Sequence, residues 1–400
     1  MKSTRKYALL AAMAFMAALP AWAQNIAVNS RIFRDGNAWV EEITGAATSP
    51  GMLRIDTELG NINVQGGPGG AQKDITYTVR KRVYSGSEEA ARRDLAKFRV
   101  SALRRSDAVV LEGHAEGHSR RMSVEYQVQV PREIQVKIST EGGSIAVRNI
   151  AGRVDAESGG GSISLGDVAG PISAETGGGS IEVANSSNLL DLRTGGGSIR
   201  ITGSKGKVKA STGGGSISLQ GASDIVALDT GGGSVKVEQC GSELHVSTGG
   251  GSINVGDVSG LARLETGGGS IRLASARGPV TAETGGGSIE LYKLMEGAKA
   301  ETGAGPITAE FLGVKTDSSL QTSVGDVIVY LGPQAKVTIK ATLDMANGHQ
   351  IRSEFPDLKI SSEGGNYGPK NYYAQGALNG GGPVLRVRTM SGNIEFRRAK

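Results

Sequence analysis

Apolar and polar residues alternate in short stretches that recur every 18 residues through the middle of the chain. Counted from a repeated serine, the positions one and three residues later are apolar, as in Ile163 and Leu165. A second apolar pair follows ten and twelve residues after the serine, as in Ile172 and Ala174. Strict alternation of this kind is typical of a β-strand with one buried face. Each unit therefore predicts at least two short strands joined by turns.

The stretches belong to a repeat built on Gly-Gly-Ser-Ile, with Val replacing Ile in one copy. A unit this short cannot bury its own apolar face, so copies must stack on one another. Like positions then pair in parallel about 4.8 Å apart. We therefore expect an all-β fold, a parallel single-chain β-solenoid of 18-residue coils, right-handed as parallel crossovers usually are. About ten coils predict a rod on the order of 50 Å long. The repeated serines are Ser144, Ser162, Ser180, Ser198, Ser216, Ser234, Ser252, Ser270 and Ser288.

Glycine runs mark one corner of each coil, as in Gly231, Gly232 and Gly233. Glycine is costly in backbone entropy, so its return in coil after coil indicates a geometric need. We expect a positive φ at these corners and too little room for a Cβ between stacked coils. On this interpretation, Gly232→Val destabilises the rod. The runs do not have the spacing of a phosphate-binding loop.

A threonine row and an acidic row precede this corner. We expect the threonine hydroxyls to satisfy backbone groups or neighbouring hydroxyls, and the alternative is a flat hydroxyl array that faces a glycan or ice. The position before each threonine mixes acids with other polar residues, which predicts a solvated face. The alternative there is a weak cation site along Glu265, Glu283 and Glu301. The threonine row is Thr176, Thr194, Thr212, Thr230, Thr248, Thr266, Thr284 and Thr302.

Cys240 is the single cysteine, so the chain cannot form an intramolecular disulfide. It stands six residues after a repeated serine, where other coils place Val168, Val258 or Leu294. We therefore expect a small buried side chain rather than a reactive thiol.

Residues 1–23 have the features of a secretory signal peptide. Basic residues precede an apolar run at 7–19, and Pro20 comes before an Ala-Trp-Ala cleavage site. That run is too short to span a bilayer of about 30 Å, and no later segment is long enough. Three charges of the net +5 lie in this segment, which leaves +2 for the mature chain. So small a charge gives no indication of nucleic acid as a partner.

The two flanks lack the strict period and are expected to cap the solenoid, because an open end would expose unpaired strand edges. The expected organisation is a signal peptide at 1–23, an N-terminal β-rich cap region with one helix at 24–135, the solenoid at 136–330, and a C-terminal divergent repeat and cap at 331–400.

Within the N-terminal flank, Ser87–Phe98 predicts the helix, with Ser87 as its N-cap. Segments near 107–114 and 121–130 alternate and predict a hairpin. Asp56–Val64 resembles an outlying repeat, and Thr389–Phe396 near the C-terminus resembles another.

The sequence offers little catalytic chemistry. The cluster from Glu112 to His118 lacks the His-Glu-x-x-His order of zinc hydrolases, and its glycines oppose a helix. Only four histidines occur, and they assemble no Ser/His/Asp set. We expect no enzyme activity, no cofactor and no metal site. The candidates for a binding surface are Tyr367, Tyr372 and Tyr373 in the C-terminal flank.

Several segments together resemble the bacterial "putative adhesin" family, which consists of secreted or envelope-associated β-solenoid domains of otherwise unknown function. The resemblance covers roughly residues 50–400. It implies the solenoid fold and brings no catalytic residues with it. The segments that carry it are Tyr126–Pro131, Val136–Ile145, Gly325–Val327, Asn379–Pro383 and Gly392–Ile394.

Three functions are compatible with this pattern. The leading hypothesis is a non-enzymatic rod, either an adhesin-like binding surface or a structural scaffold, exported to the periplasm or the cell surface. Its partner would be a cell-surface glycan or an envelope protein. The first alternative is a carbohydrate-active β-helix enzyme, although between Val136 and Gly305 only Tyr292 could supply an aromatic platform for a sugar. The second alternative is a self-assembling filament subunit.

Overall fold

The computed structural model describes residues 24–26, 28–68, 72–117, 122–346, 348–364 and 370–399. The expected signal peptide at 1–23 lies outside these residues and stays a prediction. Within the described part of the chain, no helix is both long and apolar enough to cross a membrane.

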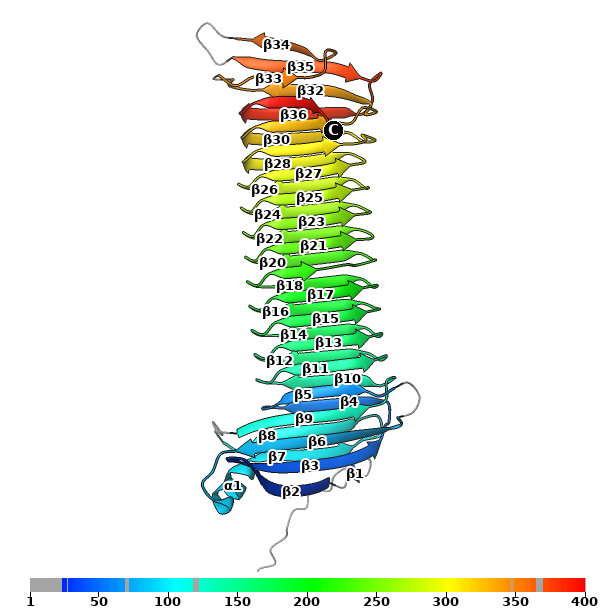
Figure 1. Cartoon of the computed structure of the whole chain (residues 1–400), viewed down its shortest axis with the longest axis vertical. Coiled ribbons are helices and arrows are strands. Elements are labelled where there is room, and N and C mark those ends of the chain that lie inside the picture. Colours follow the sequence, from blue (N-terminus) through cyan, green and yellow to red (C-terminus); the bar gives the residue numbers. More distant parts are fainter. Residues whose placement is uncertain are drawn as a thin grey trace, which may run out of the picture.

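The chain forms a rod of two long β-sheets that face each other across one continuous core (Figure 1). Each coil gives one strand to each sheet, and like positions of successive coils pair in parallel. Ile163 pairs with Ile181 and Ile172 with Leu190, which is the 18-residue register of the sequence. The parallel β-solenoid is therefore confirmed. Nineteen strands in one sheet correspond to a rod of roughly 85 Å, longer than expected because the flanks continue the stack.

Sheet A is the name used here for the sheet that contains the second strand of each coil. Its repeat strands are β10 (Gln135–Thr140), β12 (Val154–Ser158), β14 (Ile172–Thr176), β16 (Leu190–Thr194), β18 (Val208–Thr212), β20 (Val226–Thr230), β22 (Leu244–Thr248), β24 (Ala262–Thr266), β26 (Val280–Thr284) and β28 (Ala298–Ala304). Sheet B contains the first strand of each coil. Its repeat strands are β11 (Ile145–Ile150), β13 (Ile163–Val168), β15 (Ile181–Ser186), β17 (Ile199–Ser204), β19 (Ile217–Leu219), β21 (Val235–Cys240), β23 (Ile253–Val258), β25 (Ile271–Ala276), β27 (Ile289–Leu294) and β29 (Ile307–Phe311).

The threonine row is buried and holds the glycine corner together. The Thr176 hydroxyl donates to the carbonyl of Gly161 in the preceding coil at 2.8 Å and accepts from the N–H of Gly179 at 3.3 Å. The same pair of bonds recurs at Thr230, with 2.8 Å and 3.1 Å. These hydroxyls satisfy backbone groups as expected, and their burial contradicts the alternative of an exposed hydroxyl array.

The glycine corner is constrained by close approach and not by a left-handed backbone, because no glycine of the regular triplets has a positive φ. The third glycine of a triplet has no room for a side chain: a Cβ on Gly233 would lie 2.0 Å from the carbonyl oxygen of Gly215. The first is equally close, at 2.2 Å for Gly231 and Gly213. A Cβ on the middle glycine, Gly232, would meet no described atom within 4 Å. The expectation of a positive φ was therefore wrong, and Gly232 was the wrong position to substitute.

Cys240 is fully buried, as its register predicts. Burial raises the pKa of its thiol, and the sulfur lies 3.5 Å from the carbonyl oxygen of Glu243 and 3.6 Å from that of Ser242. Since the thiolate is the reactive form, we expect a maleimide reagent to label native protein far more slowly than protein unfolded in guanidinium. Fast labelling without denaturant would contradict this packing.

At the N-terminal end of the rod, the order of the coils along the stack differs from their order in the sequence. Strands β4 (Met52–Thr57) and β5 (Asn61–Gly66) form a true coil that pairs in parallel with β10 and β11. The next coil outward is β8 (Val109–Ala115) with β9 (Met122–Val130), which pair with β4 and β5. The predicted hairpin of 107–114 and 121–130 was therefore wrong, because its two strands lie in opposite sheets.

Antiparallel strands then end the stack. In sheet B, β9 is followed by β6 (Asp74–Val83), β3 (Ala38–Thr48) and β2 (Val28–Asp35). In sheet A, β8 is followed by β7 (Phe98–Arg104), whose end pairs with β1 (Gln24–Asn25). The predicted helix is α1 (Glu88–Leu95), and Ser87 caps it by accepting from the N–H of Ala90.

Glu42 ties three strands of this N-terminal end together. It accepts from Arg80 of β6 at 2.8 Å and from Arg31 of β2 at 2.9 Å, and these bonds hold its pKa below the ordinary value. The carboxylate therefore stabilises the fold above the unfolded pKa of 4.5, and that contribution is lost as pH falls through the lower folded value. We expect Glu42→Gln to lower the melting temperature at pH 7 and to have little effect in acid. A difference from wild type that does not change with pH would contradict this role.

The C-terminal end uses the same interleaving. Strands β30 (Ser318–Val324) and β31 (Val327–Leu331) continue the stack, and β36 (Val384–Ser391) with β37 (Ile394–Arg398) forms the coil above them. Strands β32 (Val337–Leu343) and β33 (Ile351–Ser353), which come earlier in the chain, stack beyond that coil. Finally, β35 (Asn371–Leu378) and β34 (Lys359–Glu363) extend sheet A antiparallel.

Candidate functional site: a polar row on sheet A

The acidic row of the sequence and one of the three candidate tyrosines lie on the same line of the outer face of sheet A. Strand pairing places Glu265, Glu283 and Glu301 next to one another, and Gln321 of β30 follows Glu301. The line then continues through the interleaved strands. Its members, called the polar row below, are Glu265, Glu283, Glu301, Gln321, Arg388, Thr342 and Tyr373.

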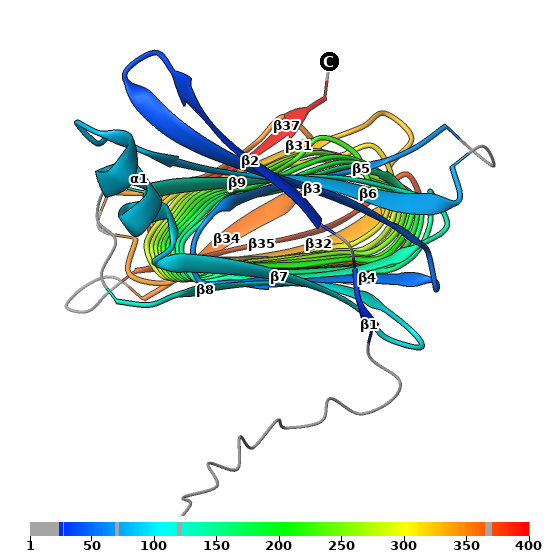
Figure 2. The same ribbon diagram turned by 90° about the horizontal axis from the view of Figure 1, so that it is seen from below.

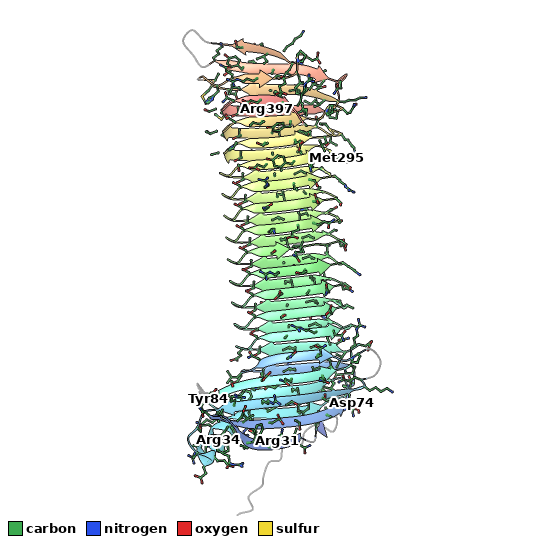
Figure 3. The ribbon with its side chains drawn as sticks, in the orientation of Figure 1. Arg31, Arg34, Asp74, Tyr84, Met295 and Arg397 are labelled. Carbon is green, nitrogen blue, oxygen red and sulfur yellow. The ribbon has the colours of Figure 1, made fainter. Side chains whose placement is uncertain are left out.

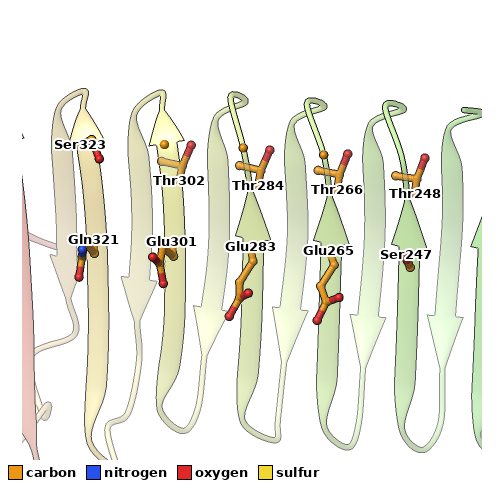
Figure 4. A pocket seen from close by; sticks show the side chains of 13 residues that line it. Ser247, Thr248, Glu265, Thr266, Glu283, Thr284, Glu301, Thr302, Gln321 and Ser323 are labelled. Carbon is orange, nitrogen blue, oxygen red and sulfur yellow. The ribbon is translucent and has the colours of Figure 1, made fainter. Parts of the chain in front are cut away.

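The acidic half of the polar row lies in a shallow groove of about 480 Å³ (Figure 4). The three glutamates point away from the core, and the buried threonines stand beside the glycine corner above them. Strand alternation explains this arrangement, because neighbouring residues of one strand face opposite sides of the sheet.

Basic side chains neutralise much of the acidic charge. The Lys299 ammonium lies 2.6 Å from Glu283 and 3.6 Å from Glu301, and the hydrogen bond from Lys299 to Glu283 raises the lysine pKa. Arg263 pairs with Glu265 in the same way. Among the described residues, no group of three or more His, Cys, Asp or Glu side chains is arranged to hold a metal ion. The geometry therefore gives no support to the cation site that the glutamate spacing suggested.

The upper half of the polar row is uncharged or basic. Arg388 pairs with Asp344 at 2.8 Å, and Thr342 lies between Arg388 and Tyr373. The row as a whole offers carboxylates, an amide, a guanidinium, a hydroxyl and a phenol in one line. Such groups can form hydrogen bonds to the hydroxyls of a glycan, and the tyrosine ring can pack against a sugar face.

The three candidate tyrosines do not share one surface. Tyr372 faces inward and packs against the core, with the Lys370 ammonium 4.9 Å from its ring centroid. Tyr373 follows it in β35 and therefore lies on the opposite, outer face, where it is half-buried. Tyr367 lies outside the described residues.

Gln321, Arg388 and Thr342 carry no signal in the sequence that marks them as members of this row. The interleaving of β36 between β30 and β32 brings these residues into line, and the 18-residue period carries no signal for such pairing. Of the metal-like cluster, His114 lies on the surface 3.4 Å from Glu58, and His118 is outside the described residues.

No protein-family model matches the sequence, and a comparison with curated proteins gives no match. Two solved structures are similar in part. One is a putative cell adhesion protein from Clostridium sporogenes, at 10% identity and a TM-score of 0.17, covering 90% of this chain and 100% of that one. The other is a putative adhesin from Bacteroides fragilis, at 10% identity and a TM-score of 0.20, covering 89% of this chain and 96% of that one. Both TM-scores are too low to transfer the fold or the function of those proteins to this chain.

Proposed function

We propose that the protein is a non-enzymatic, exported rod of the cell envelope, with the polar row as an adhesin-like surface for a glycan. The observation that carries the proposal is the row itself: hydrogen-bonding side chains aligned over seven strands on one rigid face, from β24 to β35. A solenoid holds such groups at a fixed spacing, so little ordering entropy is lost when an extended polymer binds along it.

The ion pairs on this face favour binding over hydrolysis. A glycosidase needs two carboxyl groups in different protonation states, one of them kept protonated by its surroundings. Glu283 and Glu301 instead contact the same Lys299 ammonium, at 2.6 Å and 3.6 Å, so each of the two carboxylates has the same cation beside it. The row therefore offers fixed acceptors for hydroxyl groups and no distinct general acid.

The test is a panel of envelope polysaccharides incubated with the purified mature chain, with bound and cleaved material measured separately. We expect saturable binding without new chain ends. Glu283→Ala and Tyr373→Ala are expected to weaken binding at least severalfold. Glu290→Ala and Tyr292→Ala are matched controls, because this Glu/Tyr pair lies on sheet B with the tyrosine hydroxyl 3.2 Å from the carboxylate.

Cleavage of any polysaccharide in the panel would overturn the non-enzymatic part of the proposal. Equal loss of binding in the sheet A and sheet B variants would overturn the assignment to the polar row.

A further inference from the structure

Strand β2 is a long free edge at the N-terminal end of the rod, where it lies across the end of the stack (Figure 2). It has eight residues and, among the described strands, pairs only with β3. Natural edges are usually blunted by charged side chains, above all lysine, or by proline, a bulge or a short length; β2 is eight residues long, has neither lysine nor proline, and carries the charges Arg31, Arg34 and Asp35. Its outer N–H and C=O groups can therefore pair with another strand.

Along the outer face of β2, a positive charge is followed by an aromatic ring and then by a negative charge. Arg31, Phe33 and Asp35 share this face because they alternate along the strand. The Arg31 guanidinium lies 5.1 Å from the Phe33 ring centroid, and it stands at the end of the rod (Figure 3). Both charged side chains are exposed, at 71% for Arg31 and 53% for Asp35, and each already pairs within its own chain, Arg31 with Glu42 and Asp35 with Arg82, so a contact between copies would extend these pairs.

This sequence of groups is complementary to itself in an antiparallel pair. When two β2 strands pair about Phe33, Arg31 of each copy lies opposite Asp35 of the other, and the two Phe33 rings meet at the centre. A register centred on Arg31 would instead place the two Arg31 side chains opposite each other, which is unfavourable. Charge and aromatic contact thus favour the register centred on Phe33 over the one centred on Arg31.

The inner face of β2 also has apolar surface left to cover. Val28 is 50% exposed, and Val28 and Ile32 line a groove of about 570 Å³ together with Leu95 and Phe98. In the same register, Arg34 of a second copy lies opposite Ile32, and its alkyl stem can cover that side chain.

We propose that two copies of this chain pair antiparallel through their β2 edges, with Phe33 at the two-fold axis. Sheet B then continues from one rod into the other. The interface is isologous and closed, so it yields a dimer and not a fibre. It lies at the end of the rod opposite β32–β35 and leaves both polar rows open.

Another free edge in the described chain, at the opposite end of the rod, is a natural control. Strand β34 carries Lys359, Ser361 and Glu363 on one face, which repeats the order of charges but with serine at the centre. It has only five residues, all exposed, and its lysine is a typical edge-blunting residue. We therefore assign the interface to β2.

The test is sedimentation of the mature full-length chain at micromolar concentration. Wild type is expected to be dimeric. Phe33→Lys and Phe33→Glu are each expected to be monomeric, because the substituted side chains of the two copies would lie opposite each other at the axis and their like charges would repel. An equal mixture of the two is expected to recover dimers, which a merely misfolded β2 could not do. Ser361→Lys, the matched control, is expected to stay dimeric.

A monomeric wild type would overturn the proposal, as would dimers of both Phe33 variants alone. Failure of the mixture to recover dimers would overturn the register. Dissociation by Ser361→Lys would place the contact at β34, and particles larger than dimers in wild type would indicate a filament.

Discussion

Gly233→Ala is expected to destabilise the rod strongly, whereas Gly232→Ala is expected to change its stability little. The Cβ of the first variant would lie 2.0 Å from the carbonyl oxygen of Gly215, inside the contact distance of any two heavy atoms. The neighbouring coil can relieve this only by moving away, which breaks the backbone ladder on both sides of the corner. Overpacking against rigid backbone costs on the order of 3 kcal/mol.

The two variants form a matched pair, since they are adjacent and add the same methyl group. Calorimetric melting of the mature chain compares them directly. Equal melting temperatures would show that close approach between coils does not explain the glycine triplets. A larger effect at Gly232 would restore the positive-φ explanation, which the backbone of the triplets contradicts.

Thr230→Val is the second large effect that we expect. The valine keeps the shape of threonine but removes the hydroxyl that donates to Gly215 and accepts from Gly233. Two backbone groups at a part-buried corner then lose their partner, at about 1–3 kcal/mol for each group that water cannot reach. Thr230→Ser is the control, because Ser158 makes the same two bonds at 2.8 and 2.9 Å in its own coil.

Chemical denaturation of wild type, Thr230→Val and Thr230→Ser separates the contribution of the hydroxyl group from that of the side-chain shape. We expect the Thr230→Ser variant to unfold at nearly the same denaturant concentration as wild type. The Thr230→Val variant is expected to unfold at a clearly lower concentration. If the Thr230→Val variant were as stable as wild type, the buried threonine row would matter for packing alone, and its hydrogen bonds would contribute nothing measurable to stability.

The repeat made most of the fold predictable because each coil meets only its neighbours. The buried strands, the placement of Cys240 and the role of the threonines all follow from one 18-residue register. The ends were less predictable. Pairing of β4 with β8 and of β30 with β36 joins segments more than 50 residues apart, and nothing local in the sequence specifies such partners.

The candidate site, too, could be predicted from the sequence only in part. The sequence showed the acidic residues of the polar row as a periodic feature, and it showed Tyr373 as an aromatic residue in the C-terminal flank. That they share one line depends on the interleaved C-terminal coil, which inserts Arg388 between Gln321 and Thr342. The opposite orientations of Tyr372 and Tyr373 required the strand assignment of β35.

The central claim is that an exported rod presents its surface outside the cell. A membrane-impermeant amine reagent applied to intact producing cells tests it most directly, because Lys205, Lys207 and Lys209 are exposed on one coil of the rod. We expect the protein to be labelled on intact cells and to lack residues 1–23, while a cytoplasmic control stays unlabelled. A full-length protein labelled only after complete lysis would contradict export and the adhesin-like function together.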